Sequence, residues 1–369
     1  MKRLVLVGGG HAHVHVLAAL AADPLVNTEV VLVSPYSRQI YSGMLPGWIA
    51  GCYAIDECAL ALDSLARRAK VRFVQTSCSD LDLAARHVHC ANGDNIPFDY
   101  ASIDCGSAAH PVEAGDSAGH ALPVRPIEGL VAAWPGLLER IRKSGSGFRL
   151  AIVGDGAAAI ELAFAIHARF ATEGLRQARL TLIGASPAPL AGFPFLLRRK
   201  AAQLLAARGI ACCSGRRVIA VLRSHVQLDD GSQLAADAAL LATGAAAPAW
   251  PAAGGLATDN AGFIRVSRTL QSISHPFAFA AGDIAAYAEA RPKSGVFAVR
   301  AGPPLAENLR AICSGEALKA WRPQQRALYL LSTGDRHALA AWGGFCASGA
   351  WAWRWKDRID RRFMAQFES

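Results

Sequence analysis

The chain has 369 residues, of which 52% are hydrophobic, and its formal net charge is +9. Its length suits two or three domains, and the absence of any apolar run of about 18 residues argues against a membrane-spanning helix. The basic residues are dispersed and form no aromatic-interleaved patch for nucleic acid, and the nine scattered cysteines are typical of a reducing cytoplasm.

The chain opens with an expected strand, a glycine turn and a helix. Residues 4–7 are an apolar run typical of a strand buried on both faces, and a helix is expected over residues 11–20. This order of elements cradles a dinucleotide pyrophosphate, because glycines allow close backbone approach and the helix N-terminus favours negative charge. The predicted cofactor ligands in this turn are Gly8, Gly10, His11 and Ala12.

Two positions depart from this dinucleotide fingerprint. His13 stands where a third glycine is usual, and the second strand ends at Ser34 instead of an acid that would hold a ribose. A serine still offers one hydrogen bond there. His11, His13 and His15 suggest either a metal site or core packing. Packing is favoured because only His11 and His15 share a helix face and no cysteine or carboxylate nearby completes a ligand set.

A small antiparallel layer is expected next, from residues 71–74 and 87–90. It leads to a strand that ends at Gly106, a turn suited to close approach of a ligand. Cys105, beside this glycine, either faces the cofactor or is a buried structural cysteine. Gly106 therefore joins the predicted cofactor ligands.

The opening pattern recurs in the middle of the chain. Residues 148–153 read as a strand and lead into Gly154 and Gly156, with Ala159 at the third position as an allowed variant of glycine. Gly154, Gly156 and Ala159 are the predicted ligands of a second dinucleotide. Its second strand ends at Gly184, which is neither the acid of an NAD site nor the arginine of an NADP site, so the preference stays open.

Two later glycine-containing turns complete the pattern. Gly244 ends a buried strand and returns the chain to the first domain, and residues 277–283 form another buried strand that ends at Gly282 and Asp283. Ligands of open parallel sheets bind at the carboxyl edge, so these three residues are predicted cofactor ligands. Asp283 also suits the N-cap of the next helix, and the two roles are compatible.

These motifs, in this order, resemble the two-dinucleotide-binding flavoproteins of the pyridine nucleotide-disulfide oxidoreductase superfamily over nearly the whole chain. The matching motifs are Gly8-x-Gly10 for FAD, Gly154-x-Gly156-x-x-Ala159-x-Glu161 for the nicotinamide nucleotide, and Ala242-Thr243-Gly244 with Ala281-Gly282-Asp283 for the late flavin-domain motifs. The resemblance implies an α/β fold with two doubly wound Rossmann-like domains, FAD and NAD(P)H as cofactors, and Asp283 as the residue that holds the ribityl chain of FAD.

Within the superfamily the chain looks most like the type II NADH dehydrogenases and sulfide:quinone reductases. It is most similar to the flavoprotein-like N-terminal part of some selenide, water dikinases, through residues 8–13, 36–47 and 292–300. The likeness to the type II NADH dehydrogenases and sulfide:quinone reductases places Pro46 in the loop beside the isoalloxazine, and Arg38, earlier in the same loop, is a further predicted cofactor ligand. The quinone-reducing members differ at residues 295–296 and 300–301, which weighs against quinone reduction. The sulfide-oxidising cysteines of the sulfide:quinone reductases have no clear counterparts, which weighs against sulfide oxidation.

The resemblance divides the chain into an FAD domain (1–124 with 246–310), an NAD(P) domain (125–245) and a C-terminal α+β extension (311–369). The implied reaction passes a hydride from NAD(P)H to flavin and on to a small acceptor: a quinone, a disulfide or a selenium or sulfur compound. Glu161 is either a catalytic residue near the nicotinamide or a helix N-terminal acid. Lys293 either lies at the flavin carbonyl edge as a second catalytic residue or is a solvated loop lysine.

Two alternatives remain open from the sequence. A non-catalytic flavin-binding sensor or scaffold is favoured by Gly184 and His13 and opposed by the intact second fingerprint. In the C-terminal segment, Trp351, Trp355 and Ile359 share one face of an expected helix with basic residues elsewhere. This pattern fits either peripheral membrane contact of a cytoplasmic protein or packing, including a homodimer seam.

Overall fold

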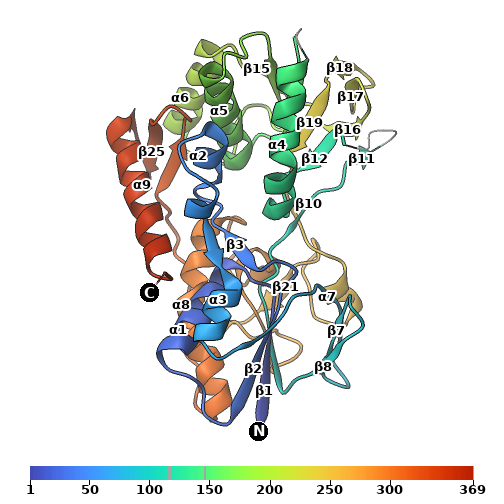
Figure 1. The fold of residues 1–369 in the computed structure, drawn as a ribbon, viewed down its shortest axis with the longest axis vertical. Coiled ribbons are helices and arrows are strands. Elements are labelled where there is room, and N and C mark those ends of the chain that lie inside the picture. Colours follow the sequence, from blue (N-terminus) through green and yellow to red (C-terminus); the bar gives the residue numbers. More distant parts are fainter. Residues whose placement is uncertain (115–118, 145–146, 369) are drawn as a thin grey trace.

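The computed structural model describes residues 1–114, 119–144 and 147–368. Two α/β bodies are stacked along the long axis of the molecule (Figure 1). The first holds the N-terminus, and the second holds the middle of the chain. The C-terminal helix and hairpin run along one side of both bodies (Figure 1).

The first body is built on a five-stranded parallel sheet with β1 at its centre. In spatial order the strands are β22 (Ala278–Ala280), β9 (Tyr100–Ile103), β1 (Lys2–Val7), β2 (Thr28–Val33) and β5 (Arg72–Val74). The prediction that residues 71–74 join an antiparallel layer is wrong, because β5 pairs in parallel with β2. Strand β5 therefore forms one edge of the parallel sheet, and its residues Phe73 and Val74 pack against the core.

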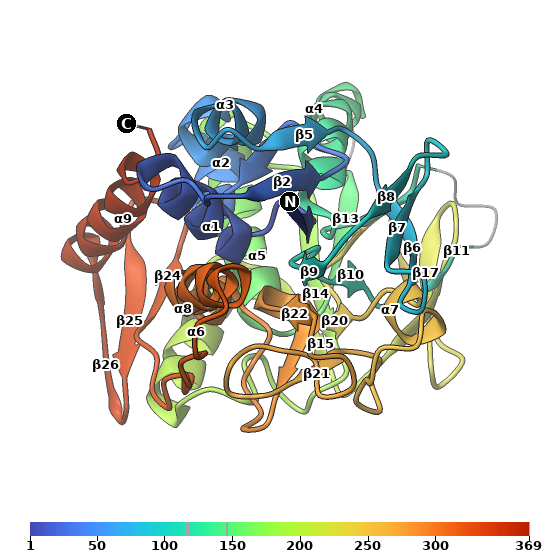
Figure 2. The ribbon, with the colours of Figure 1, turned by 90° about the horizontal axis from the view of Figure 1, so that it is seen from below.

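Helices and short strands surround this sheet. Helices α1 (His11–Ala22) and α8 (Gly295–Ser314) pack side by side (Figure 2). The other elements of this body are β3 (Arg38–Ile40), α2 (Leu45–Ala50), η1 (Asp56–Cys58), β4 (Ala59–Ala61), α3 (Leu62–Arg68), β6 (Cys78–Asp82), β7 (His87–Cys90), β8 (Asn95–Pro97), α7 (Trp250–Ala253), β21 (Ile264–Val266), η2 (Gly282–Ile284) and β23 (Ala285–Tyr287).

The second body repeats this plan. Its parallel sheet has the order β12 (Ala121–Pro123), β19 (Ala238–Leu241), β13 (Arg149–Val153), β14 (Arg179–Gly184) and β15 (Ala211–Ser214). The remaining elements are α4 (Ile127–Lys143), α5 (Ala157–Thr172), α6 (Phe195–Ala207), β11 (Glu113–Ala114), β16 (Val218–Val221), β17 (His225–Leu228) and β18 (Gln233–Ala235). The central strand β13 corresponds to β1, and the predicted doubly wound α/β fold is confirmed.

The chain crosses between the bodies twice, and the two crossings pair. Strands β10 (Ala108–Ala109) and β20 (Ala245–Ala246) form a two-stranded antiparallel ribbon. Strand β12 already belongs to the second sheet, before the predicted boundary at residue 124. The domain boundaries themselves stay a prediction.

The C-terminal part consists of a three-stranded antiparallel sheet and a helix: β24 (Tyr329–Ser332), β25 (Ala338–Trp342), β26 (Phe345–Gly349) and α9 (Ala350–Ala365). Phe363, Met364 and Phe367 are buried, and α9 packs along β24, β25 and β26. Among the helices of the described residues, none has the length and apolar character that a bilayer crossing requires.

Candidate functional site

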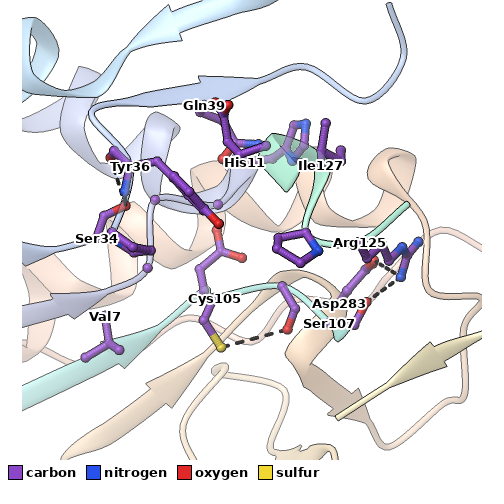
Figure 3. Close-up of a pocket in the computed structure, with 18 of the residues that line it drawn as sticks. Val7, His11, Ser34, Tyr36, Gln39, Cys105, Ser107, Arg125, Ile127 and Asp283 are labelled. Carbon is purple, nitrogen blue, oxygen red and sulfur yellow. Dashed lines mark hydrogen bonds and ion pairs between the residues drawn. The ribbon is translucent and has the colours of Figure 1, made fainter. Parts of the chain in front are cut away.

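A cavity of about 410 Å³ opens at the carboxyl ends of β1, β2 and β9. Ser34 and Tyr36 lie at one end of the labelled residues, and Arg125 and Asp283 lie at the other (Figure 3). The predicted ligands that line the cavity are Gly8, Gly10, His11, Ser34, Arg38, Gly106 and Asp283. The cavity therefore lies at the carboxyl edge of the sheet, where open parallel sheets bind their ligands.

The first glycine turn is tightly packed. Gly8 has φ +93°, and its N–H donates to the Val33 carbonyl at 2.8 Å. A Cβ at Gly8 would lie 2.5 Å from the Asp104 carbonyl oxygen, and one at Gly10 would lie 2.3 Å from the Asp104 Cγ. Side chains would collide at both positions, so the turn requires glycine there.

Asp104 was missed by sequence reasoning and is the central carboxyl of this site. It is buried, and its Oδ2 accepts hydrogen bonds from the amides of Ala12 at 2.8 Å and His13 at 3.0 Å. Burial raises the pKa of Asp104 to about 7, with the Asp283 charge adding to this effect and the two amide bonds opposing it. The available signal was an acid that ends an apolar strand two residues before Gly106.

His13 is a packing residue. Its Nδ1 lies 2.6 Å from the Gly8 carbonyl oxygen and its Nε2 lies 2.8 Å from Ser102 Oγ. The carbonyl can only accept, so Nδ1 carries the proton and Ser102 donates to Nε2. Burial lowers the pKa of His13 to about 4. Both ring nitrogens are therefore used inside the protein.

His11 and His15 pack against aromatic rings. The ring of His11 lies 5.6 Å from that of Tyr41, and the ring of His15 lies 5.0 Å from that of Phe367, measured between centroids. Within residues 1–114, 119–144 and 147–368, no three His, Cys, Asp or Glu side chains gather as a metal site would require. The structure thus gives these histidines aromatic neighbours from the C-terminal segment and from the loop after β3.

Two arginines reach the cavity, and sequence reasoning found only one of them. Arg38 binds Glu128 through two hydrogen bonds of 3.0 and 3.1 Å. Arg125 was missed; it pairs with Asp283 at 3.1 Å and donates to Ser107 (Figure 3). Both pairs join the first body to residues at or near the start of α4.

Three predicted ligands and Lys293, a predicted catalytic residue, lie close to the cavity or behind it instead of lining it. Ala12 is buried in α1 and contributes its amide to Asp104. Gly282, with φ +71°, packs under Asp104, where a Cβ would lie 2.3 Å from Oδ1. Pro46 is buried in α2, which packs against α5. Lys293 donates to the Ala285 carbonyl at 2.5 Å and lies over the Phe263 ring at 3.9 Å.

Lys293 is partly buried in the first body. Burial lowers the pKa of its ammonium, and the charges of Asp283 and Asp259 oppose that shift. Its contacts with a carbonyl and an aromatic face hold the side chain inside the first body.

The second glycine turn reproduces the first. The Gly154 N–H donates to the Ile183 carbonyl at 2.7 Å, and a Cβ at Gly154 would lie 2.2 Å from the Ala242 carbonyl oxygen. Gly156 is the N-cap of α5, and Ala159 is fully buried. Gly244 accepts a hydrogen bond from the His110 amide at 3.2 Å, at the crossing between the bodies.

Glu161 belongs to a buried polar cluster under the C-terminal part. Its Oε1 accepts the Ser332 amide at 2.8 Å, and burial raises the pKa of its carboxyl to about 7, with Lys356 lowering it and Asp360 adding to the rise. Lys356 donates to Asp360 at 2.6 Å and to the Gly43 carbonyl at 2.5 Å. We call Tyr41, Glu161, Lys356 and Asp360 the Glu161 cluster.

The charges in this cluster act on one another. Burial alone would lower the pKa of Lys356, but the carboxylates of Asp360 and Glu161 raise it above its usual value. Burial, and then Asp360, raises the pKa of Tyr41. Sequence reasoning missed Lys356 and Asp360, because no local pattern shows that this turn of α9 is buried beside Glu161 of α5 and Gly43 in the loop after β3.

Comparison with known proteins agrees with this arrangement. A family model described as pyridine nucleotide-disulphide oxidoreductase matches residues 2–302. The fold is similar to a sulfide:quinone oxidoreductase from Aquifex aeolicus, with 18% identity, TM-score 0.83, and coverage of 100% of this chain and 91% of that one. It is also similar to a water-forming NADH oxidase from Lactobacillus brevis, bound to NADH, with 18% identity, TM-score 0.75, and coverage of 93% and 75%.

A third similar structure is a ferredoxin reductase from Rhodopseudomonas palustris, with 17% identity, TM-score 0.74, and coverage of 92% of this chain and 82% of that one. At these identities the likeness concerns the fold. The pairing of two doubly wound bodies is therefore shared with these structures.

Proposed function

This chain belongs to the pyridine nucleotide-disulphide oxidoreductase family, and we propose that it oxidises NAD(P)H through FAD and reduces a small-molecule acceptor. Family membership confirms the prediction of an FAD-dependent NAD(P)H oxidoreductase. The observation that carries the proposal is the repeat of one glycine turn, with the same backbone contact and the same excluded Cβ, on two parallel sheets.

The first body has the features that FAD requires. Gly8, Gly10 and His11 line the cavity at the α1 N-terminus, where a pyrophosphate would bind. Arg38 and Arg125, each paired with a carboxylate, also line this cavity. Asp283, paired with Arg125, is the predicted partner of the ribityl hydroxyls. Bound FAD would accept the hydride of the nicotinamide and pass electrons on; the protein residues orient it and tune its surroundings.

The second body would hold the nicotinamide nucleotide at Gly154, Gly156 and Ala159. Glu161 lies on α5, the helix that follows this turn, and belongs to the Glu161 cluster. A carboxyl with a pKa of about 7 binds and releases protons near neutrality. The cluster therefore suits an acceptor that takes up protons along with two electrons.

The acceptor classes that meet this condition are a quinone, a disulfide and an oxidised selenium or sulfur compound. In each case NAD(P)H and one proton give NAD(P)⁺ and a two-electron-reduced, protonated acceptor. The resemblance to the flavoprotein-like part of selenide, water dikinases is part of this proposal, and it is the reason for including selenium compounds.

The decisive experiment mixes the FAD-loaded protein anaerobically with NADH or NADPH and follows flavin absorbance. Bleaching of the flavin supports the proposal, and recovery of colour on adding one acceptor from the panel identifies the acceptor class. A flavin that neither nucleotide reduces would overturn the proposal and leave a binding protein.

The proposed location is the cytoplasm, as the dispersed cysteines suggest. All nine cysteines are free. We further propose that the outer face of α9 contacts a membrane surface or a second copy of the chain. Trp351 and Trp355 are 47% and 44% exposed, and their rings stack at 6.4 Å.

A further inference from the structure

Strand β14 ends at Gly184 and so lacks the acidic side chain that would identify an NAD site. A carboxylate from another residue, Asp155, nevertheless lies at this strand end. A Cβ built on Gly184 would lie 2.4 Å from the Cβ of Asp155 and 2.6 Å from its Oδ2. Asp155 is the residue between the two glycines of the second turn. Its side chain therefore reaches the end of the second strand from the glycine turn.

The carboxylate of Asp155 is fixed in this position. Its Oδ2 accepts the Ser186 amide at 2.7 Å, and its backbone carbonyl accepts the Leu190 amide at 2.8 Å. These bonds join the turn to the loop that follows β14. The residue remains partly exposed, so a ligand at the strand end can reach it.

This contact also explains the glycine at position 184. Any side chain there would overlap Asp155, since Cβ contacts below 3 Å do not occur without a shift of the neighbour. The usual strand-end acid and Asp155 thus exclude each other. The chain has an acid in the turn and a glycine at the end of the strand, where NAD sites usually have an acid.

We propose that Asp155 takes the place of the strand-end acid, accepts the hydroxyls of the adenosine ribose and makes NADH the preferred nucleotide. A carboxylate can accept hydrogen bonds from the two ribose hydroxyls, and it repels the 2′-phosphate of NADPH. This inference rests on the proposed function, because it assigns specificity to the second dinucleotide site.

The charged group that competes with this assignment is Arg216. Its amide donates to the Gly184 carbonyl at 3.0 Å, so its backbone adjoins the same strand end. Its guanidinium, however, pairs with Asp230 at 2.9 Å in the turn after β17. An arginine in this position would attract a 2′-phosphate if it left Asp230.

The test measures binding of NAD⁺ and NADP⁺ to the FAD-loaded protein by isothermal titration calorimetry. Charge-assisted hydrogen bonds contribute enough for the wild-type protein to bind NAD⁺ at least roughly tenfold more tightly than NADP⁺. Asp155→Asn keeps an acceptor for the Ser186 amide but removes the charge. This variant should bind NAD⁺ less tightly and NADP⁺ more tightly, bringing the ratio close to one.

A double variant, Asp155→Gly with Gly184→Asp, moves the acid to the strand and should restore the preference for NAD⁺. Asp229→Asn is the matched control: it removes an exposed acid from the same turn as Asp230, leaves the pair between Arg216 and Asp230 in place, and should leave the affinity for both nucleotides unchanged. Equal or tighter binding of NADP⁺ by the wild-type protein would overturn the inference, and so would an Asp155→Asn variant with an unaltered ratio.

A preference for NADP⁺ that disappears in Arg216→Ala would assign the site to Arg216 instead. Binding of neither nucleotide would overturn the proposed function and this inference with it. Binding of both without discrimination would overturn the inference alone. Circular dichroism of each variant separates a loss of affinity from a loss of fold.

Discussion

The carboxylate of Asp104 caps the first turn of α1, where it accepts the amide of Ala12 at 2.8 Å. Helix N-termini at glycine turns bind the phosphates of dinucleotides. Asp104 and the expected pyrophosphate would therefore compete for the backbone amides at the start of α1. The neutral form of Asp104 reduces this conflict, and burial raises its pKa to about 7.

The first prediction follows from that pKa. In the unfolded chain the pKa of an aspartate is about 3.9, whereas the pKa of Asp104 in the folded protein is about 7. The folded state therefore binds more protons between these values, and stability falls as pH rises through this window. Buried His11, His13 and His15 have lowered pKa values of about 4 and act in the opposite direction, so the test compares two proteins. From pH 5 to pH 8, the melting temperature of the FAD-free wild-type protein should fall more, or rise less, than that of Asp104→Asn.

Glu161 carries a similar shift, so Asp104→Asn removes only part of the pH dependence. Asp237→Asn is the matched control: a hydrogen bond from Arg149 lowers the pKa of Asp237, so this carboxyl is ionised in both states between pH 5 and 8, and its loss should leave the pH dependence in this window unchanged. A melting profile for Asp104→Asn that parallels the wild type would mean that Asp104 is ionised throughout this range.

The second prediction concerns Arg125 and Asp283, which pair at 3.1 Å beside the cavity. Arg125→Gln should weaken FAD binding roughly tenfold, because a charge-assisted contact is lost and Asp283 is left without its partner. Asp283→Ala should also lower FAD retention. Fluorescence titration of FAD into the apoprotein measures both effects. Arg140→Gln, on α4 but outside the cavity lining, should bind FAD like the wild type; equal weakening in Arg140→Gln would show that net charge alone is responsible.

The third prediction concerns the proton held by Glu161. In Glu161→Gln the side-chain amide would not titrate, although its oxygen could still accept the Ser332 amide. The substitution should therefore slow turnover several-fold and flatten its pH dependence near pH 7. NAD⁺ affinity should change little. Stopped-flow measurement of flavin reduction and of flavin reoxidation locates the slowed step. Unchanged rates for both steps would remove Glu161 from the active site.

The sequence predicted the elements that repeat. Both glycine turns, their flanking strands and the closing strand at Asp283 follow from apolar runs interrupted by glycine, because a buried parallel strand and a phosphate-binding turn each have a strict local composition. The parallel strand β5 was not predictable in this way. A three-residue strand has the same pattern in a parallel or an antiparallel layer, and only its partner decides.

Contacts between distant segments account for the missed site residues. The role of each missed residue depends on a partner from another part of the chain; these residues are Asp104, Arg125, Lys356 and Asp360. Neither apolar periodicity nor glycine spacing predicts such a partner. His13 was visible as a departure from the fingerprint, but Ser102, which makes its buried ring tolerable, lies on a different strand.

The last prediction concerns the outer face of α9. Phe363 and Met364 bury the inner face of this helix, whereas Trp351, Trp355 and Ile359 are 47%, 44% and 41% exposed, with exposed Arg354, Arg358 and Arg362 on the same helix. Exposed tryptophans with arginines suit the interface of an anionic bilayer.

Removing α9 altogether would uncover the core and the Glu161 cluster, so substitutions on the outer face are the sharper test. The wild-type protein should co-sediment with phosphatidylserine-containing vesicles at low salt and less at high salt, because screening weakens the contribution of the arginines. Trp351→Ser with Trp355→Ser should abolish sedimentation, whereas Phe195→Ser with Leu196→Ser, which alters exposed apolar residues on α6, should not. If the wild-type protein stays in the supernatant at both salt concentrations, the outer face of α9 does not bind lipid, and size-exclusion chromatography of the same variants then tests it as a contact between two copies of the chain.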